Sequence, residues 1–482
     1  MNKNFISGRL TIIAMAVALF SVAFPSCKKE DDTPPVVTGC TDCTLFDTTE
    51  ILDGTEVLET IVTIDDRGKG LGTMTFTKDK TWVIEGFVFV NEGQTLTIEP
   101  GTIIKGKSGQ GENASALIVA RGAKILASGT ALEPIVFTAE ADGLRRKADG
   151  SGYENGGNLP FTARGLWGGV IILGNASQNT APAEQAIEGI PTDEARGIYG
   201  GTNDADNSGV FQYVSIRHGG TDIGAGNEIN GLSLGCVGNG TTIDHIEVIA
   251  NKDDGVEFYG GTVNTSHIVV VAVGDDGIDY DQGYRGKNQF IAVYYEPNTG
   301  GSMGEHDGGT TPEDGAPYAT PTFYNCTYFG RGAGAGKNTL VFRDNAGGNY
   351  QNSIMMNQDK GATIEDLASG EDSKARLDAG DLQYKNNIHW NVAGNDSTMQ
   401  ITYAGTSTED ASAHANVSNI MIVDPMMTSG TLIPTANATG ATGLTGDNFI
   451  KDVSYYGAFD PASSTHWFDG WTLIGEGKVI AK

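Results

Sequence analysis

Residues 243–283 read IDHIEVIANKDDGVEFYGGTVNTSHIVVVAVGDDGIDYDQG, and this stretch states one phrase twice. The second copy follows 22 residues after the first. Asp253-Asp254-Gly255 returns as Asp275-Asp276-Gly277, and Val256-Glu257-Phe258 returns as Ile278-Asp279-Tyr280. A fixed period of this size is typical of a solenoid, in which each repeat forms one layer on the last. The repeated residues are β-branched, aromatic, Gly and Asp, without helical spacing. The sequence therefore predicts an all-β protein built as a parallel β-helix.

The composition fits many short strands joined by tight turns. Gly accounts for 68 of the 482 residues, and charged residues make up only 19%. Gly, Asn and Asp interrupt short apolar runs, as they do between strands. The formal net charge of −29 argues against nucleic acid and anionic lipid headgroups as partners. It favours cations, cationic ligands, or solubility alone.

Residues 1–26 are expected to be a targeting segment. A basic start is followed by an apolar run of about 14 residues, too short for a membrane span. Cys27 comes directly after this run, as in bacterial lipoproteins, and residues 28–32 resemble the lipoprotein export signal of Bacteroidota. We therefore expect acylated Cys27 to anchor the protein in the outer membrane, exposed at the cell surface. An ordinary secretory signal with a charged linker is the alternative.

The remaining cysteines fall into two pairs of different character. Cys40 and Cys43 form a CxxC motif in a linker rich in Thr, Pro and Gly. A small structural disulfide suits that setting better than a redox or zinc site. Cys236 and Cys326 are expected to be small buried residues within the coils.

Five parts are predicted along the chain. A solenoid must cover its ends, because its first and last coils expose core residues and unpaired strand edges. Stretches 139–165, 296–320 and 331–338 are expected to be loops. The predicted parts are the signal segment 1–26, the lipidated Cys and flexible linker 27–45, an N-terminal cap 46–85, the β-helix 86–425 and a C-terminal cap 426–482.

Three motifs carry a resemblance to a known family. They are Leu-Thr-Ile-Glu-Pro-Gly-Thr at 96–102, Gly-Thr-Ala-Leu-Glu-Pro-Ile-Val-Phe-Thr at 129–138 and Trp-Gly-Gly-Val-Ile-Ile-Leu-Gly at 167–174. They resemble the opening coils of exported, pectate-lyase-like surface lipoproteins of Bacteroidota and marine proteobacteria. The likeness extends over residues 86–474. It implies a single-stranded right-handed parallel β-helix and a surface location, but almost no activity, because that family is largely uncharacterised.

The coil also brings acidic residues together. Neighbouring strands lie about 4.8 Å apart, so residues one coil apart stack at that spacing. Val256 and Phe258 are expected to face inward, which turns Glu257 and Tyr259 outward. Two carboxylates at about 5 Å repel by roughly 3 kcal/mol at an effective dielectric of about 20, so solvent, a proton, a cation or a donor such as Arg285 or Lys252 must relieve them. Seven acids are predicted on this face: Asp253, Asp254, Glu257, Asp275, Asp276, Asp279 and Asp281.

Three interpretations of this carboxylate ladder stay open. In the first, the Asp side chains cap turns through hydrogen bonds to the backbone, and Asn230 holds the same place one coil earlier. In the second, the ladder binds Ca²⁺, which prefers clustered carboxylates and backbone carbonyls. The candidate ligands are Asp253, Asp254, Asp275, Asp276, Asp279 and Asp281.

The third interpretation is catalytic, through Asp275, Asp276 and Asp279. Residues 274–278 resemble the paired-Asp motif of polygalacturonases, in which two acids activate water and a third protonates the leaving group. The other two motifs of those enzymes, Gly-His-Gly and Arg-Ile-Lys, are missing. Glu305-His306-Asp307 is only a loose substitute.

The favoured function is a surface platform that binds a polysaccharide or another surface component. The alternatives are a polysaccharide lyase or glycoside hydrolase that uses the same carboxylates, and a structural or adhesive surface protein. His218, His245 and His267 are expected to be hydrogen-bonded turn or strand residues rather than metal ligands. The expected binding residues are Glu257, Tyr259, Tyr284 and Arg285.

Overall fold

The computed structural model describes residues 45–475 with short gaps. The chain divides into two units, 1–35 and 36–482, and every described residue belongs to the second. The predictions for the signal segment, for Cys27 and for the CxxC pair lie outside the described residues. The gaps are 54–55, 148–149, 151, 155–158, 225–226, 310, 429–430 and 445.

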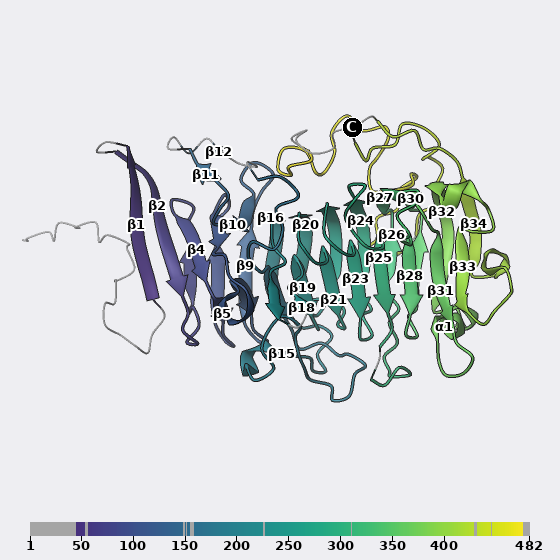
Figure 1. The fold of residues 1–482 in the computed structure, drawn as a ribbon, viewed down its shortest axis with the longest axis horizontal. Coiled ribbons are helices and arrows are strands. Elements are labelled where there is room, and N and C mark those ends of the chain that lie inside the picture. Colours follow the sequence, from purple (N-terminus) through teal and green to yellow (C-terminus); the bar gives the residue numbers. More distant parts are fainter. Residues whose placement is uncertain are drawn as a thin grey trace, which may run out of the picture. The chain divides into compact units, whose positions relative to one another are not determined.

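The strands of the two large sheets, apart from β1 (Leu45–Asp53), stack in parallel, coil upon coil, which confirms the predicted β-helix (Figure 1). Among the described residues, three short antiparallel pairs lie outside these sheets: β11 (Arg145–Arg146) with β12 (Tyr153–Glu154), β14 (Gln185–Ala186) with β15 (Ile198–Tyr199), and β17 (Asp222–Gly224) with β18 (Asn227–Glu228). One ten-stranded sheet, called sheet B, forms one side. Its strands in order are β5 (Phe87–Val90), β8 (Ala116–Val119), β13 (Val170–Leu173), β19 (Leu232–Gly235), β21 (Val256–Tyr259), β23 (Ile278–Asp281), β25 (Gly304–Asp307), β28 (Leu340–Arg343), β31 (Ala362–Asp366) and β33 (Ile401–Gly405).

The other large sheet, called sheet A, has eighteen strands and covers the rest of each coil. β16 pairs with β9 along its first half and with β10 along its second, so the sheet bends in the middle. Its strands are β1 (Leu45–Asp53), β2 (Glu56–Asp65), β3 (Met74–Phe76), β4 (Thr81–Glu85), β6 (Thr95–Ile98), β7 (Ile103–Gly106), β9 (Lys124–Ser128), β10 (Ile135–Ala139), β16 (Gly209–Arg217), β20 (Thr242–Ile249), β22 (Asn264–Val271), β24 (Lys287–Tyr294), β26 (Thr322–Tyr324), β27 (Thr327–Gly332), β29 (Gly348–Gln351), β30 (Ile354–Gln358), β32 (Leu382–Val392) and β34 (Val417–Ile422).

From β16 onward, one left-handed residue per coil makes this bend. β20 pairs with β22 through Asp244 and Ser266, and then through Ile246 and Ile268, so that His245 and His267 are skipped. Asn and His are among the non-Gly residues that enter this backbone region most readily. The bend column, with its φ values, is Tyr213 (50°), His245 (56°), His267 (57°), Phe290 (61°), Asn325 (55°), Asn352 (55°), Asn386 (55°) and Asn419 (56°).

The 22-residue period holds for one coil and then lengthens by one. Between β21 and β23, Glu257 pairs with Asp279, as predicted. Between β22 and β24, Ile268 pairs with Ile291. From the sequence, a constant step of 22 residues predicts that Ile268 pairs with Phe290; this prediction is wrong, and Phe290 takes the bend position instead. The extra residue lies in the turn between β23 and β24, where it leaves the strands undisturbed.

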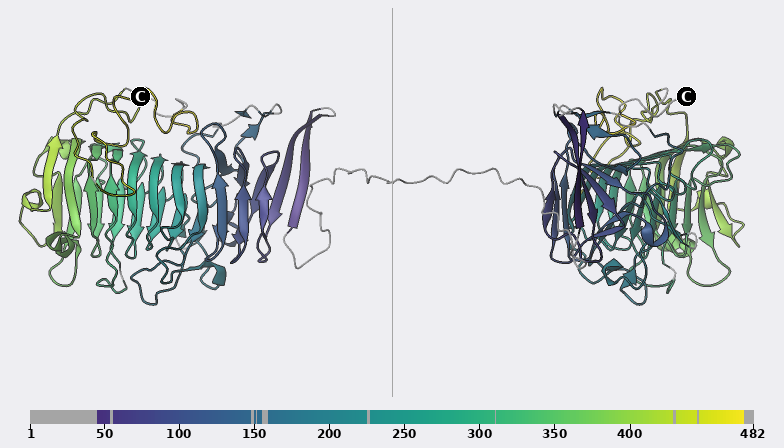
Figure 2. Two further views of the ribbon diagram at one scale, coloured as in Figure 1. Left: turned by 180° about the vertical axis from the view of Figure 1, so that it is seen from behind. Right: turned by 60° about the vertical axis from the view of Figure 1, so that its left-hand side comes forward.

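Both predicted caps need correction. β2 already pairs in parallel with β4 through Ile61 and Thr81, so the coil begins before residue 86 and only antiparallel β1 departs from it. The described residues of 424–475, called the strap, do not close the last coil. They run back along the side of the β-helix toward its middle coils (Figures 1 and 2). There the backbone N–H of Leu473 donates to Glu247 Oε1 of β20 at 2.7 Å.

The strap takes this path because sheet A is apolar on both faces. Outward-facing Ile249, Val269 and Val271 pack with Phe459 and Phe468 of the strap. Residues 268–273 read IVVVAV, a continuous apolar run rather than an alternating one. Such a run is typical of a parallel strand that is covered on both sides.

The interior and the one described α-helix complete the fold. Cys236 and Cys326 are free and buried, as predicted. Helix α1 (Ser373–Ala379) begins at Asp372, whose side chain caps it, and ends at left-handed Gly380. None of the helices in the described part of the chain is long and apolar enough to span a membrane.

Candidate functional site

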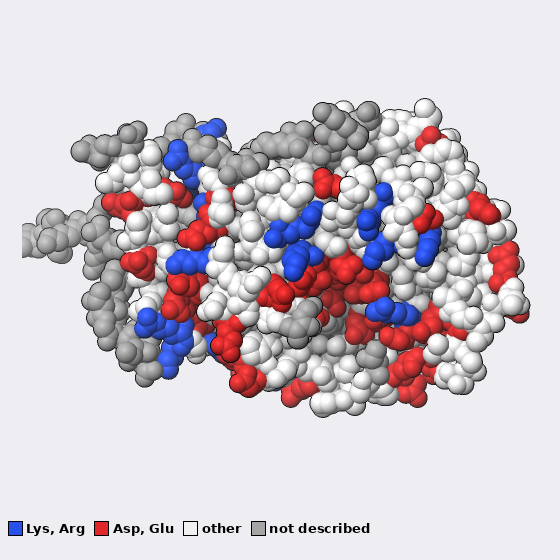
Figure 3. Space-filling view, in the orientation of Figure 1, with Lys and Arg blue, Asp and Glu red and all other residues white. Residues whose placement is uncertain are grey.

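The carboxylate ladder forms on the outer face of sheet B. Val256 and Phe258 lie in the core, as predicted, so Glu257 and Tyr259 face outward. The strand register puts Asp279 beside Glu257 and Asp281 beside Tyr259. Acidic side chains accordingly gather over the middle of this face (Figure 3).

The inner part of the ladder is buried. Asp254 is 7% exposed, Glu257 8% and Asp276 5%. Asp254, Glu257 and Asp279 each offer a carboxylate oxygen, and these atoms lie within 4.8 Å of one another. Asp275 is exposed, whereas Asp253, Asp279 and Asp281 are half-buried. The ladder is therefore an enclosed carboxylate group with acids around it, not a row of solvated side chains.

Some of these carboxylates cap the neighbouring coil. Asp254 Oδ1 accepts the backbone N–H of Asp276 at 2.8 Å. Asn230 stands one coil before Asp254, as predicted, and its Nδ2 donates to Glu257 Oε2 and, at 3.2 Å, to Tyr259 Oη. The turn-capping interpretation thus accounts for part of the cluster.

Three buried oxygens at the ladder have no hydrogen-bond partner among the described residues. They are Asn230 Oδ1, Asp276 Oδ1 and Asp279 Oδ1. Leaving a buried acceptor unpaired costs about 1–3 kcal/mol. Gly301 faces two of the carboxylates, because a Cβ on it would come within 2.2 Å of Asp275 Oδ1 and 2.3 Å of Asp276 Oδ1. Turn capping leaves these oxygens unexplained.

Positive side chains stand at the border of the ladder and not inside it. Among the described residues, no Lys or Arg forms an ion pair with Asp254, Glu257, Asp276 or Asp279. Lys252 pairs with Glu228, and Arg285 pairs with Asp204 at 3.0 Å. Neither of the two expected donors therefore neutralises the buried group.

Burial without a counter-ion raises the pKa values of the buried and half-buried acids of the ladder. Burial, reinforced by Glu228, Glu188 and Asp275, raises the pKa of Asp253 to about 7. Burial also raises the pKa of Asp281 to about 6. The pKa values of Asp254, Glu257, Asp276 and Asp279 stand well above the usual range of a carboxyl group, again mainly because of burial.

Residues outside the predicted ladder extend it. β25 pairs with β23 and adds Glu305 and Asp307, although this stretch was expected to be loop. The alternation Gly-Glu-His-Asp, which matches Ile-Asp-Tyr-Asp of β23, was the available signal. Arg343 ends the row, at 3.0 Å from Glu305 Oε1 and 2.7 Å from Asp307 Oδ1. Glu188 Oε2 accepts from Tyr259 Oη at 3.0 Å, and no sequence signal indicated that contact.

The expected aromatic binding residues do not line an open face. Tyr284 is fully buried in the core against Phe258, with ring centroids 4.3 Å apart, so a direct ligand contact for Tyr284 is contradicted. Its neighbour Tyr280 is also in the core. Tyr259 does lie at the ladder, but Tyr199 covers it. Side chains of the 174–207 connection thus cover this end of the ladder.

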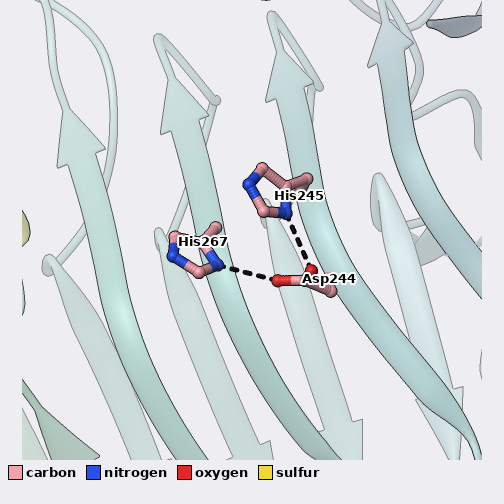
Figure 4. Close-up of side chains that lie close together, drawn as sticks. All are labelled: Asp244, His245 and His267. Carbon is pink, nitrogen blue, oxygen red and sulfur yellow. Dashed lines mark hydrogen bonds and ion pairs between the residues drawn. The ribbon is translucent and has the colours of Figure 1, made fainter. Parts of the chain in front are cut away.

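The histidines are structural in different ways. His306 lies in the core, where its Nε2 is 2.7 Å from Tyr350 Oη and burial lowers its pKa to about 3. This position rules His306 out as a catalytic substitute at the ladder. His218 is buried, with Nδ1 2.7 Å from the carbonyl of Ala163. His245 and His267 share the carboxylate of Asp244 on the opposite, sheet A, side of the coil (Figure 4).

Comparison with protein families decides the fold family. A model described as "Pectate-lyase like beta helix domain" matches residues 68–431. The chain belongs to this family. The matched region contains the whole ladder and starts close to the first parallel pairing, between β2 and β4. Neither the search of curated proteins nor the search of solved structures returned a match.

Proposed function

We propose that this pectate-lyase-like β-helix is a cation-dependent binding platform, with Ca²⁺ held at the ladder by Asp254, Glu257 and Asp279. The observation that carries the proposal is the enclosed carboxylate group with unpaired oxygens and no ion-pair partner. A divalent cation supplies the missing positive charge and gives the orphaned oxygens something to bind. It also stabilises the ionised form of groups that burial otherwise keeps protonated.

The donor set suits Ca²⁺ better than a transition metal. It contains oxygen atoms alone, and Ca²⁺ takes six to eight oxygen ligands at about 2.3–2.6 Å. Asp276 and the amide oxygen of Asn230 are further oxygen donors on the same face. Asp253, Asp275 and Asp281, which the sequence also nominated, surround the group and add negative charge.

The proposed ligand is a polysaccharide or another cell-surface component that contacts the exposed rim. Asp275 is exposed at that rim, and Arg343 stands at its far end. A cation between the ladder and an anionic or hydroxyl-rich chain would accept oxygen ligands from both and so join them. Proposed anchoring through acylated Cys27 in the outer membrane would hold this face at the cell surface, and C27A should release the protein into the soluble fraction.

A Ca²⁺ titration followed by thermal unfolding tests the cation site. The metal-free protein should gain several degrees in melting temperature on adding Ca²⁺, because an ion that binds only the folded state stabilises it. Asp254→Asn with Glu257→Gln should abolish the gain, whereas exposed Glu409→Gln should leave it intact. An unchanged melting temperature in the wild-type protein refutes the site.

A second candidate function is hydrolysis or lyase chemistry by the same carboxylates. It is favoured by the raised pKa values, because a carboxyl group that keeps its proton near neutral pH can act as a general acid. A panel of acidic and neutral polysaccharides would reveal new reducing ends or unsaturated products. Products that persist in Asp279→Asn would come from another site.

A further inference from the structure

A second column of titratable side chains lies on the sheet A side, at the bend. Four rings stack there, one per coil, with centroids 4.2 Å apart from Tyr213 to His245, 4.3 Å from His245 to His267 and 5.1 Å from His267 to Phe290. The left-handed bend brings these rings into one column, since it recurs at the same place in successive coils from Tyr213 onward. The two imidazoles therefore face each other directly.

A single carboxylate serves both imidazoles. His245 Nδ1 is 2.8 Å from Asp244 Oδ2, and His267 Nδ1 is 2.8 Å from Asp244 Oδ1 (Figure 4). Gln212 Nε2 and Ser266 Oγ also donate to Asp244, at 3.0 and 2.7 Å. An ionised carboxylate only accepts, so both neutral rings donate through Nδ1. Each Nε2 is then the atom that takes up a proton in acid.

The geometry disfavours one metal ion at this group. A metal bound to an imidazole lies near the plane of the ring, along the nitrogen lone pair. The planes of His245 and His267 are 21° apart and face each other across 4.3 Å. An ion between the two Nδ1 atoms would stand well out of both planes. Hydrogen bonding, and not coordination, is the chemistry these rings are placed for.

The strap rests on this stack. Trp471 packs against His245 with centroids 6.0 Å apart, and Trp467 packs against His267 at 5.4 Å. Both histidine side chains are nearly enclosed, at 13% and 11% exposed. Charge added to the stack therefore has little solvent to shield it while the strap is in place.

We propose that the His245–His267 stack is an acid-sensitive latch for the strap, which it holds at neutral pH and releases when both imidazoles are protonated. The first proton makes one imidazolium, which Asp244 neutralises. The second places two like charges face to face, with one carboxylate between them. Lifting the strap lets water reach both rings, and it also uncovers the apolar outer face of β20, β22 and β24.

The surrounding groups support this direction. β20 contributes Asp244, β16 contributes Tyr213, and β22 and β24 add uncharged Ser266 and Phe290. From the strap comes Lys451, whose positive charge adds to the repulsion. Burial lowers the pKa of His267 below its usual value, and the charges of His245 and Lys451 add to this, against the opposing hydrogen bond to Asp244. A lowered pKa means that stability is complete above about pH 6.5 and is lost as the pH falls.

Amide hydrogen exchange of the intact protein tests the latch. Exchange in residues 467–473, corrected for its intrinsic pH dependence, should rise about tenfold or more between about pH 7.5 and pH 5, while β20 and β22 stay protected. H245N combined with H267N should abolish the rise. Asn suits the site because Asn325, Asn352, Asn386 and Asn419 occupy the same left-handed position in later coils.

The control is His414→Asn, which removes an imidazole that pairs with Asp378 far along the chain. It should keep the acid response of the wild-type protein. A strap equally protected at both pH values overturns the proposal, and so does a rise that survives in the double variant. H267N alone already prevents two facing charges, so it serves as the test should the double variant fold poorly.

Discussion

The ladder and the histidine stack are two columns made by the same coil, and they are opposites. In each, residues 22 apart in the sequence come to lie side by side: Glu257 beside Asp279, and His245 beside His267. In the stack, the Nδ1 atoms of both imidazoles have a hydrogen-bond partner, because Asp244 accepts from His245 and from His267. The ladder has like charges and unpaired oxygens. Repetition thus brings groups together, and only the neighbours decide whether the result stabilises the fold.

The largest expected effect comes from removing the carboxylate that both imidazoles of the histidine stack share. Asp244→Ala removes the acceptor of two imidazoles, a hydroxyl and an amide, and we expect it to lower the free energy of unfolding by about 3 kcal/mol at neutral pH. Chemical denaturation of the purified protein measures this. A loss below about 0.5 kcal/mol would mean that the stack is held by ring packing alone.

The ladder should respond in the opposite direction. In the presence of a chelator, Asp279→Asn removes a carboxyl group whose raised pKa makes it take up a proton on folding, which costs stability at alkaline pH. We expect this to raise the free energy of unfolding by about 1 to 2 kcal/mol at about pH 8. With Ca²⁺ added, the same variant should be the less stable protein. A variant that is destabilised under both conditions would show that Asp279 is already neutralised within the fold.

The two columns should also differ in their pH dependence. The pKa of Asp253 is raised to about 7, above its unfolded value. A raised carboxyl pKa contributes stability at low pH that is lost as the pH rises through about 7, whereas the lowered pKa of His267 costs stability as the pH falls. Metal-free protein should therefore lose on the order of 1 kcal/mol between about pH 5 and pH 8 through Asp253.

Asp253→Asn isolates this contribution. Thermal unfolding in chelator across the same pH range should show a flatter profile for the variant than for the wild-type protein. Identical profiles would place the titration of the ladder on other residues, with Asp281 as the next to test.

The smallest effect is expected at the border of the ladder. Lys252 is exposed and pairs with Glu228, so Lys252→Gln should change stability by less than about 1 kcal/mol. It should also leave the Ca²⁺ response unchanged. A large loss in metal-free protein would identify Lys252 as the counter-charge of the ladder after all, through its proximity to Asp253.

Much of the coil was predictable because its signal is local and repeated. The outward direction of Glu257 and the pairing with Asp279 followed from strand alternation and the period. One added turn residue was enough to misplace Phe290. The boundaries failed for a different reason: β2 joins the parallel coil without carrying the repeat, and the path of the strap depends on which distant surface is apolar.

The candidate site divides in the same way. That seven acids share one face followed from spacing. The cover over Tyr259, which donates to Glu257, comes from Glu188 and Tyr199, and these belong to a connection of no recognisable pattern. Tyr284 looked like an outward aromatic because it follows the ladder closely. It lies past the end of β23, and its ring packs in the core against Phe258.

The sequence by itself determined the fold class, the coil period and the meeting of like residues in columns, because each of these follows from a repeat and from the geometry of parallel strands. The tertiary structure decided what surrounds each column: a shared carboxylate and the strap at His245 and His267, and an enclosed, uncompensated group at Asp254, Glu257 and Asp279. Burial and counter-charge come from segments far away in the chain. No local pattern encodes them, and they set both the pKa values and the chemistry.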